Sequence, residues 1–444
     1  MTGSDGTASD NTGMDAARMV NGFDAARTDG LDPELRHLVR RRDAALGGAY
    51  RLFYATPVRF ARGEGVYLYD PDGNEYLDAY NNVPSVGHSH PRVTAAVSRQ
   101  LQTLNTHTRY LTDGLVDYAE RLLATHQLGP AHAMFTCTGS EANDLALRIA
   151  RLYTGGTGVI VTANAYHGVT SAVAELSPSL GVPLGPHVRA VPAPPTAADV
   201  AAAIADLEGH GVRLAAFLAD SLLSSDGVLP DPAGFLKPVQ DVVRAAGGLY
   251  IADEVQSGFG RTGGQLWGYQ RHGLDPDIVV MGKPMGNGMP IAGIVVRREV
   301  LADFGATVRY FNTFGGNPVC VAAAAAVLDV LETEQLPVNA AATGGYLKAE
   351  LARVAAASPL LAEVRGAGLY LGADVVDPAT GLPSGARAAA IVNGMRDRRV
   401  LISATGPLGH TLKIRPPLPF TRANADHLVE VLAATLTDLA TTSA

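Results

Sequence analysis

The sequence predicts an α/β protein in which a mainly parallel sheet is flanked by helices and a small α+β part is formed by both chain ends. Between about residues 114 and 320, short apolar runs alternate with helical stretches, which is typical of a parallel sheet covered on both faces. Mixed helical and strand patterns flank this region on either side. A chain of 444 residues with 47% hydrophobic content can bury a large core and is expected to form two domains.

The N-terminal region is expected to contribute an arm and then part of the small domain. Residues 1–30 are rich in Gly, Ser, Thr and Asp and lack periodic apolar positions, so we expect a disordered or mobile arm. Residues 31–113 follow as the N-terminal part of the small domain. Within them, residues 65–78 are predicted to form a hairpin, because alternating apolar residues flank the turn sequence Asp70-Pro-Asp-Gly73.

The large domain is expected to span residues 114–334, and its sheet is predicted from five short apolar runs. These runs are Ala133–Thr136, Gly158–Val161, Leu214–Leu218, Leu249–Ala252 and Ile278–Met281. Ligands of such sheets bind beyond the carboxyl ends of the strands, so the residues after each run are candidates for a site. Residues 335–444 supply the C-terminal part of the small domain. Helices are expected near 317–333, 338–356 and 423–440, with short strands near Leu369 and Leu412.

Charge and cysteine content narrow the class of protein. A net charge of −8 and the lack of basic blocks interleaved with aromatics argue against a nucleic-acid partner. Cys137 and Cys320 both lie in apolar surroundings, which indicates free thiols in a reducing compartment. No export signal and no apolar stretch long enough to span a membrane is recognisable. We therefore expect a cytoplasmic enzyme that acts on a small uncharged or anionic metabolite.

The first polar cluster at a strand end is Cys137-Thr-Gly-Ser-Glu-Ala-Asn-Asp144, which leads into a helical run. Gly139 and Ser140 should therefore lie at a helix N-terminus, where free backbone N–H groups and the positive end of the helix dipole can hold a phosphate. An ordinary N-cap followed by a glutamate would leave the same pattern. Taken alone, this motif does not separate the two interpretations.

The second cluster, Asp253-Glu-Val-Gln256, places a carboxylate at the end of an apolar strand. A buried acid there requires a cationic partner, which can be a protonated ring nitrogen of a cofactor or an arginine such as Arg261. The following segment, residues 258–263, matches G-x-G-x-x-G. It lacks the strand before it and the helix after it that a dinucleotide site needs, so no such site is expected.

Lys283 lies between another predicted strand end and a glycine-rich loop, in Met281-Gly-Lys-Pro-Met-Gly-Asn-Gly-Met-Pro290. A lysine in a partly dry crevice has a depressed pKa and is nucleophilic toward aldehydes, although a lone lysine more often binds phosphate or pairs with an acid. Pyridoxal phosphate requires three groups: a lysine, a buried acid and a phosphate cradle. This chain is expected to carry all three at strand ends. The combination predicts this cofactor and a Schiff base on Lys283.

Several motifs, in order, make the chain from about residue 50 to 440 resemble the class III aminotransferases, which are fold type I pyridoxal-phosphate enzymes. They are Asp72-Gly-Asn-Glu-Tyr-Leu-Asp78, Gly87-His-Ser-His-Pro91, Thr138-Gly-Ser-Glu-Ala-Asn143, Tyr166-His-Gly168, Asp253-Glu-Val-Gln256, Gly282-Lys283 and Asn312-Thr-Phe-Gly-Gly-Asn-Pro318. The resemblance implies a homodimer with its active sites at the subunit interface.

The resemblance also implies a role for each matching residue. Lys283 would form the Schiff base, Asp253 would bond the pyridine nitrogen, and Gln256 would lie near the ring hydroxyl. The remaining cofactor contacts would be Tyr166 stacked on the ring, Gly139 and Ser140 on the phosphate, and Thr313 on the phosphate of the neighbouring subunit's cofactor. The pair His88 and His90 is interpreted as structural, so no metal site is expected.

Within the family, four segments are most similar to the phospho-lyase branch, which eliminates phosphate from phosphoethanolamine or phosphohydroxylysine. They are Asn81-Asn-Val-Pro-Ser-Val-Gly-His88, Leu104-Asn-Thr-His-Thr-Arg-Tyr110, Gly282-Lys-Pro-Met-Gly-Asn-Gly288 and Leu412-Lys-Ile-Arg-Pro-Pro417. Glutamate-using members carry an arginine where this chain has Lys413, and a gating glutamate where it has Ser225. A lysine cannot make the bidentate contact to a carboxylate, which disfavours transamination with glutamate.

Two departures from the phospho-lyase branch leave the leaving group open. Met289 stands where a histidine is expected, and residues 224–228 replace a segment with a glycine pair. Both are expected to border the crevice, where a methionine favours an apolar or sulfur-bearing substrate part.

The leading interpretation is a lyase that removes a β or γ leaving group from an amine or amino acid, with Arg109, Lys413 and Arg415 as candidate substrate ligands. The alternatives are an enzyme that couples the eliminated intermediate to a second substrate by C–C bond formation, an ω-aminotransferase, and a cofactor-binding regulatory protein without turnover.

Overall fold

The computed structural model describes residues 19–442. Most of the predicted N-terminal arm, residues 1–18, lies outside this part of the chain. The rest of the arm differs from the prediction, because residues 25–30 form the 3-10 helix η1 (Ala25–Gly30), which Asp24 caps through the backbone N–H of Ala26. Backbone bonding also ties residues 19–24 to the segment around Phe53.

The predicted large sheet is present and has seven strands in the order β4-β10-β9-β8-β7-β5-β6. The strands are β4 (Ala131–Thr136), β5 (Gly158–Thr162), β6 (Val188–Val191), β7 (Leu214–Asp220), β8 (Leu249–Asp253), β9 (Ile278–Met281) and β10 (Ala292–Arg297). All five predicted runs are strands of this sheet. The strands from β9 to β6 pair in parallel, whereas β10 runs antiparallel to β9 and β4.

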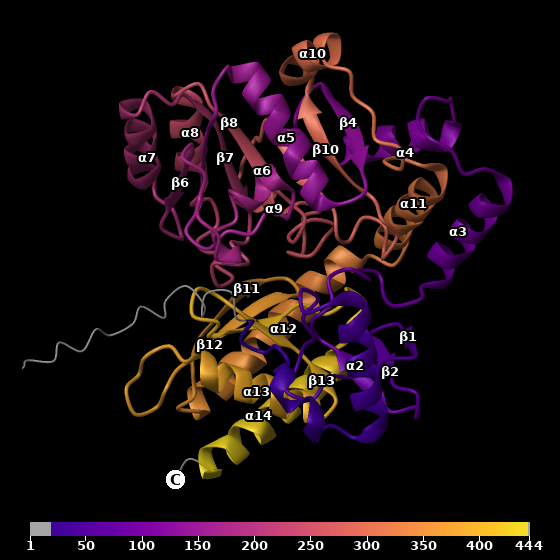
Figure 1. The fold of residues 1–444 in the computed structure, drawn as a ribbon, viewed down its shortest axis with the longest axis vertical. Helices are drawn as coiled ribbons and strands as arrows, with labels where there is room; N and C mark the ends of the chain where they lie inside the picture. Colours follow the sequence, from indigo (N-terminus) through magenta and orange to yellow (C-terminus); the bar gives the residue numbers. More distant parts are fainter. Residues whose placement is uncertain (1–18, 443–444) are drawn as a thin grey trace, which may run out of the picture.

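Helices cover both faces of this sheet, as Figure 1 shows in its upper part. One face packs against α5 (Gly139–Thr154) and α10 (Arg298–Thr307). The other packs against α4 (Asp113–Ala124), α7 (Ala197–Gly209), α8 (Lys237–Ala245) and α11 (Pro318–Thr333). Along each strand, alternate residues belong to the two cores, as the period of two in a β-strand requires. Two short helices, α6 (Ser171–Ala174) and α9 (Gly268–Arg271), interrupt the loops of this part.

The second part of the molecule contains two smaller sheets and draws on both chain ends. One sheet has the order β11-β12-β15-β14, with β11 (Leu361–Ala367), β12 (Tyr370–Val375), β15 (Thr411–Ile414) and β14 (Ser403–Thr405). The other pairs β1 (Arg62–Glu64), β2 (Tyr67–Tyr69) and β3 (Glu75–Asp78) with β13 (Val400–Leu401). The antiparallel pairing of β2 with β3 agrees with the predicted hairpin.

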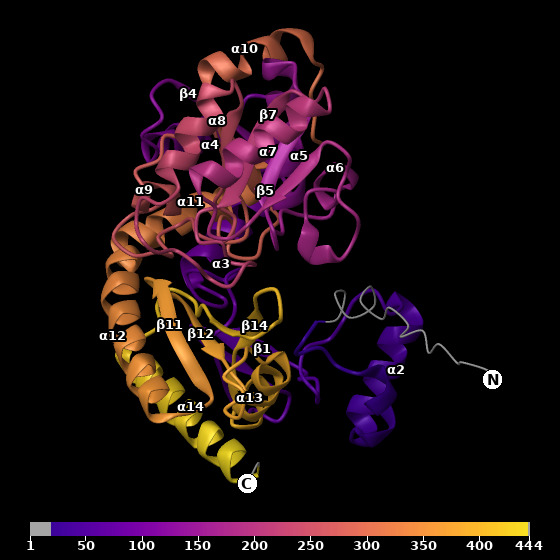
Figure 2. The same cartoon turned by 90° about the vertical axis from the view of Figure 1, so that its left-hand side faces the viewer.

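Helices α12 (Leu336–Ala357), α13 (Gly385–Asp397) and α14 (Arg422–Thr442) complete the second part, and α2 (Pro33–Leu46) stands apart from it in Figure 2. Helix α3 (Pro91–Thr103) falls within residues 31–113 but packs along α11, so it adjoins the large sheet rather than the two smaller ones. The division into residues 1–30, 31–113, 114–334 and 335–444 stays a proposal.

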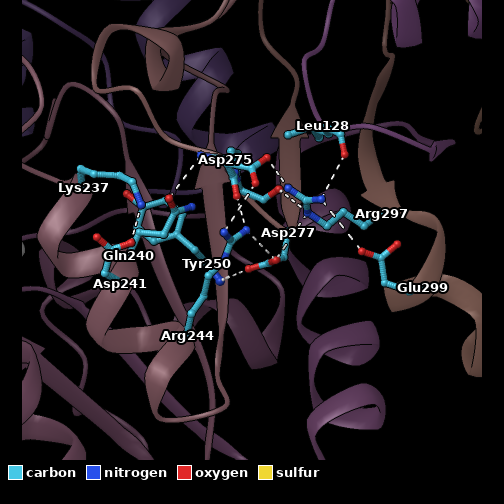
Figure 3. Close-up of polar contacts among 11 residues, drawn as sticks. Leu128, Lys237, Gln240, Asp241, Arg244, Tyr250, Asp275, Asp277, Arg297 and Glu299 are labelled. Atoms are coloured by element: carbon cyan, nitrogen blue, oxygen red, sulfur yellow. Dashed lines mark hydrogen bonds and ion pairs between the residues drawn. The ribbon is translucent and has the colours of Figure 1, made fainter.

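A network of charged residues joins the starts of β8 and β9 to the end of β10 (Figure 3). The Asp277 carboxylate accepts hydrogen bonds from the backbone N–H of Tyr250 at 2.8 Å and from Arg244 at 3.0 Å. Arg297 pairs with Asp275 and donates to the backbone carbonyl of Leu128 at 3.1 Å. These bonds lie at the amino ends of the parallel strands β8 and β9. Ligands of such sheets bind at the opposite, carboxyl ends of the strands.

Candidate active site

Lys283 follows β9 directly and enters a loop that is held to the second part of the molecule. Asn287 accepts a hydrogen bond from the backbone N–H of Val86 at 3.0 Å and donates to the carbonyl of Gly87 at 2.9 Å. Burial and the positive charge of Arg415 lower the pKa of the Lys283 amine to about 8, against the opposing attraction of Asp253 and Asp220. A substantial fraction of this amine is therefore neutral, and nucleophilic, near neutral pH.

Asp253 ends β8, the strand next to β9, and only 4% of it is exposed. Its carboxylate accepts hydrogen bonds from His167 Nδ1 at 2.7 Å, Asn143 Nδ2 at 3.0 Å and the backbone N–H of Val255 at 3.1 Å. The alternative partner, Arg261, instead donates to the carbonyls of Leu369 and Pro416. The sequence showed neither the histidine nor the asparagine as partners of the acid, because His167 comes from the loop after β5 and Asn143 from α5.

Gly139 and Ser140 form the first turn of α5, and Thr138 caps the helix. Thr138 and Glu141 make a capping box, which already engages the backbone N–H of Glu141. The backbone N–H groups of Gly139 and Ser140 precede that of Ala142, the first to donate to a carbonyl of the helix start, so they can bind an anion. Gly168 is required beside them, because a Cβ at this position would lie 2.5 Å from Ser140 Oγ.

Tyr166 lies in the loop after β5 and is 37% exposed. The next residue, His167, bonds Asp253, so this loop crosses the carboxyl end of β8. Burial and the nearby Asp253 raise the pKa of the Tyr166 hydroxyl, which keeps it protonated. The structure thus brings Tyr166, Asp253, Lys283 and the start of α5 together, as the sequence predicted.

Gln256 and Arg415 contact each other, and Arg415 also acts on the pKa of Lys283. The Arg415 guanidinium donates to Gln256 Oε1, and it lies over the ring of Tyr80 at 4.6 Å and that of Tyr370 at 5.8 Å from the ring centroids. Gln256 also accepts a bond on its carbonyl from Asn82 at 3.0 Å. Arg415 is therefore held in place by side chains as well as by its backbone N–H, which donates to the carbonyl of Ala79 at 2.9 Å.

Lys413 lies on β15 and is 8% exposed, yet its amine makes no hydrogen bond or ion pair with any residue that the structure describes. Burial, Arg415 and Lys283 together lower the pKa of Lys413 well below its usual value. Ser224 Oγ and the Tyr370 hydroxyl are also buried; burial raises the pKa of Tyr370, and the nearby Ser224 hydroxyl opposes this shift. The Nζ atom of Lys413 lies 5.8 Å from the centre of the Tyr370 ring, which is within reach of a cation–π contact.

Arg109 and Thr313 lie elsewhere on the chain. Arg109 is exposed and packs 3.8 Å over the ring of Phe311. Thr313 is exposed in the same loop, whose Asn312 reaches Glu141 at the start of α5. Neither residue contacts the cluster around Lys283 within this chain.

Asp220 is a site residue that sequence reasoning missed. It ends β7 and pairs in register with Asp253 on β8. Its carboxylate accepts from the backbone N–H groups of Leu222 and Ser224, both at 2.9 Å, and burial raises its pKa. Its place at the end of an apolar run was the same signal that identified Asp253.

The histidine pair has structural partners. His88 bonds Asp78 at 2.7 Å, and His90 caps α3 and contacts Glu334 at 3.2 Å. Among residues 19–442, no group of His, Cys, Asp and Glu is arranged to hold a metal ion. In the same part of the chain, no helix is both long and apolar enough to cross a membrane.

Comparison with known proteins gives the family. The family model for "Aminotransferase class-III" matches residues 53–436. The chain belongs to the class III aminotransferases. Members of this family use pyridoxal 5'-phosphate, and the chain is an enzyme of this cofactor type.

Three relatives show the range of the similarity. "Alanine--glyoxylate aminotransferase 2-like" of Drosophila melanogaster is 40% identical over 88% of this chain and 85% of its own length. "Ethanolamine-phosphate phospho-lyase homolog 1" of Caenorhabditis elegans is 37% identical over 90% of this chain and 93% of its own. A solved phospholyase from Arthrobacter, in complex with phosphoethanolamine, is 45% identical, has a TM-score of 0.87, and covers 90% of this chain and 99% of its own.

The described residues fit pyridoxal phosphate. The glycine cradle at Gly139 and Gly168 leaves space and free N–H groups for a phosphate, and Asp253 offers a buried carboxylate with no cation of its own. When bound, the cofactor supplies the aldehyde that captures an amine and a ring that accepts an electron pair. Lys283 is the amine whose depressed pKa suits that capture.

The pKa of Lys283 leads to a prediction for the cofactor-free protein. Only the neutral amine attacks an aldehyde, so covalent uptake of pyridoxal phosphate should rise with pH, reach half its maximum near pH 8 and then level off. The rate can be followed by quenching with borohydride and counting the label on Lys283. A midpoint near the ordinary lysine value would show that burial and Arg415 do not depress this pKa.

Proposed function

We propose that this protein is a pyridoxal-phosphate-dependent lyase that eliminates phosphate from a small amino phosphate such as phosphoethanolamine. The observation that carries the proposal is the buried amine of Lys413, which has no partner among the described residues. An unpaired buried ammonium group is costly, and its low pKa reflects that cost. An anionic group on a ligand would relieve it.

The groups around Lys413 favour a phosphate rather than a carboxylate. Lys413 is a point charge with three donors, whereas bidentate recognition of a carboxylate needs an arginine fork. Arg415 is already engaged by Gln256 and packed between two rings, which restricts how it can turn toward a ligand. The buried hydroxyls of Ser224 and Tyr370 add donors suited to a tetrahedral anion.

The proposed roles follow from where each residue lies. Lys283, with a pKa of about 8, holds and returns the proton at the carbon next to the substrate nitrogen. Asp253 keeps the ring nitrogen protonated, and His167 and Asn143 fix the orientation of its carboxylate. Tyr166 lies against the ring, Gln256 lies near the ring hydroxyl, and Gly139 with Ser140 binds the cofactor phosphate.

Two relatives support elimination through their names. The Arthrobacter phospholyase was solved with phosphoethanolamine, and the Caenorhabditis elegans relative is named for the same substrate. The Drosophila melanogaster relative is named for alanine–glyoxylate transamination instead, at a similar identity. Transamination is therefore the second candidate. It differs from elimination because it converts the cofactor to its amine form.

The two candidates separate in one experiment. Supplied with phosphoethanolamine, the purified enzyme is expected to release inorganic phosphate over many turnovers without an amino acceptor. A single stoichiometric conversion of the cofactor to its amine form, reversed by a 2-oxo acid and without phosphate release, would overturn the lyase proposal.

A matched variant tests the part played by Lys413. Lys413→Met keeps the length of the side chain but removes the charge, and it is expected to raise KM for phosphoethanolamine by roughly 30-fold or more, because truncating a buried charge partner costs about 2–5 kcal/mol. Lys237→Met is the control, because Lys237 forms an exposed ion pair with Asp241. This variant should leave KM for phosphoethanolamine unchanged. An unchanged KM in Lys413→Met would place the substrate phosphate elsewhere.

The proposal includes a homodimer with active sites at the interface. Exposed apolar residues cluster where the loops around residues 107–111 and 308–314 meet, and Leu111 is 99% exposed in the single chain. Thr313 and Arg109 lie in these loops, so a second copy would cover the apolar surface and bring Thr313 toward the neighbouring cofactor phosphate. Sedimentation should give a dimer, and an active, cofactor-saturated monomer would contradict it.

The proposed compartment is the cytoplasm. Cys137 and Cys320 are both free thiols, and burial raises the pKa of each, which keeps them protonated and unreactive. Fractionation of cells that produce the full chain tests this location.

A further inference from the structure

The segment between β7 and α8, residues 221–228, is held in an unusual backbone conformation. Leu223 has a φ of 46°, Gly227 of 127° and Val228 of 61°. A positive φ is especially costly for a β-branched residue such as valine, and such conformations persist only where the surroundings impose them. The segment also carries Ser224, one of the buried hydroxyls of the proposed substrate pocket.

Asp226 connects this segment to the loop of Tyr166. Its carboxylate accepts hydrogen bonds from Thr162 Oγ1 at 2.6 Å and from the backbone N–H of Asn164 at 2.8 Å. The Asn164 side chain returns a bond of 2.5 Å to the carbonyl of Ser225. Three hydrogen bonds therefore join the start of the Tyr166 loop to the segment that carries Ser224.

Asp226 is 8% exposed and forms no ion pair with any residue of the described part of the chain. Burial of an acid without a cation is unfavourable, and it raises the pKa of Asp226. The hydrogen bonds from Thr162 and Asn164, and the nearby His167, oppose this effect of burial.

The far side of the segment is bonded to the second part of the molecule. Arg365, on β11, donates to the carbonyls of Gly227 and Val228 at 2.7 Å and 2.9 Å, and pairs with Asp374 at 2.6 Å. Thr405, on β14, donates to the carbonyl of Ser224 at 3.0 Å. With these anchors in place, Asp226 is the only side chain of residues 221–228 that bonds the Tyr166 loop in the described structure.

We infer that Asp226 is a positioning residue that fixes the Tyr166 loop, and with it the ring-facing tyrosine and His167, relative to the Ser224 end of the substrate pocket. The inference rests on the proposed place of Tyr166 against the cofactor ring. It does not depend on which reaction the enzyme catalyses. Asp226 acts through Thr162 and Asn164.

Hydrogen exchange on the cofactor-free protein gives the first test. Asp226→Ala is expected to speed exchange of the amides of residues 163–168 by roughly 10- to 100-fold, the effect of losing a hydrogen bond to a charged group. Thr162→Val, which removes only the 2.6 Å bond, should give a smaller increase in the same peptides. It also serves as the second variant if Asp226→Ala fails to fold.

Thr154→Val is the matched control. Thr154 is likewise buried, and its hydroxyl donates to the carbonyl of Ala150 at 2.8 Å, but it lies at the far end of α5. The control should leave exchange of residues 163–168 as in the wild type. Equal exchange of those residues in the control and in Asp226→Ala would overturn the inference.

The bound cofactor gives a second readout. The visible circular dichroism of the loaded enzyme reports the fixed surroundings of the ring, and Asp226→Ala is expected to lower its intensity at full cofactor occupancy. Asp226→Asn keeps one oxygen for the Asn164 N–H and is expected to restore most of the signal. An unchanged dichroism in Asp226→Ala would refute the inference. Both readouts are independent of phosphate release, so they hold or fail separately from the lyase proposal.

Discussion

Replacing Lys283 with alanine is expected to lower kcat by about 10⁴-fold or more while the protein still binds pyridoxal phosphate noncovalently. The amine that has a pKa of about 8 is lost, and with it the group that moves the proton at the substrate carbon. The phosphate cradle at Gly139 and Gly168 and the carboxylate of Asp253 are left in place. Phosphate release from phosphoethanolamine and cofactor content, measured on the same sample, check the two parts of this expectation.

A second lysine controls for the general effect of removing a charge. Lys348 donates to the carbonyl of Gly366 at 3.0 Å on the second sheet, and Lys348→Ala should leave kcat within about twofold, as is usual for substitutions away from a site. Borohydride treatment of the wild type should attach the cofactor to Lys283. Retention of a tenth of the activity in Lys283→Ala, or a label on another lysine, would contradict the assignment.

The parts of the site that could be predicted are the residues that directly follow the strands of the parallel sheet. Lys283, Asp253 and the start of α5 each follow a short apolar run, and in a mainly parallel sheet the carboxyl ends of the strands lie at one edge. Strand order was not needed for that inference. It was needed to know that β8 and β9 are neighbours, which places the acid and the lysine side by side.

The parts that could not be predicted depend on contacts between loops that are far apart in the sequence. The bond between His167 and Asp253 joins the ends of β5 and β8, which are not adjacent strands. Arg109, within the segment Leu104–Tyr110, packs on Phe311 at the surface of the single chain, so its expected role as a substrate ligand stays a prediction. Met289 packs, partly buried, against the main hydrophobic core, and its expected place at the crevice stays a prediction.

The two cations near the substrate were predicted together but lie in different environments. Arg415 is engaged by Gln256 and two aromatic rings, whereas Lys413 has no partner among the described residues. Both are on or just after β15, where side chains alternate between faces, so sequence position alone does not show which one is free. The free one is the better candidate for an anionic ligand.

Asp253→Asn is expected to lower kcat by roughly 10²- to 10³-fold with little change in KM. A carboxylate beside a protonated ring nitrogen raises the pKa of that nitrogen by about one to three units, and an amide of the same size removes this support. The bond from Asn143 at 3.0 Å can persist in the variant, because the new side chain keeps one oxygen. Activity must be expressed per bound cofactor, so that weaker binding is not mistaken for slower chemistry.

Asp277→Asn is the matched control for this variant, because Asp277 is also a buried aspartate of the same sheet, at the opposite edge (Figure 3). It loses the charged contact with Arg244 and should lower the thermal unfolding midpoint while leaving kcat per bound cofactor unchanged. The two variants therefore separate a loss of stability from a loss of catalysis. Full activity of Asp253→Asn at full cofactor occupancy would mean that the ring nitrogen does not depend on this carboxylate, and the role assigned to the end of β8 would be wrong.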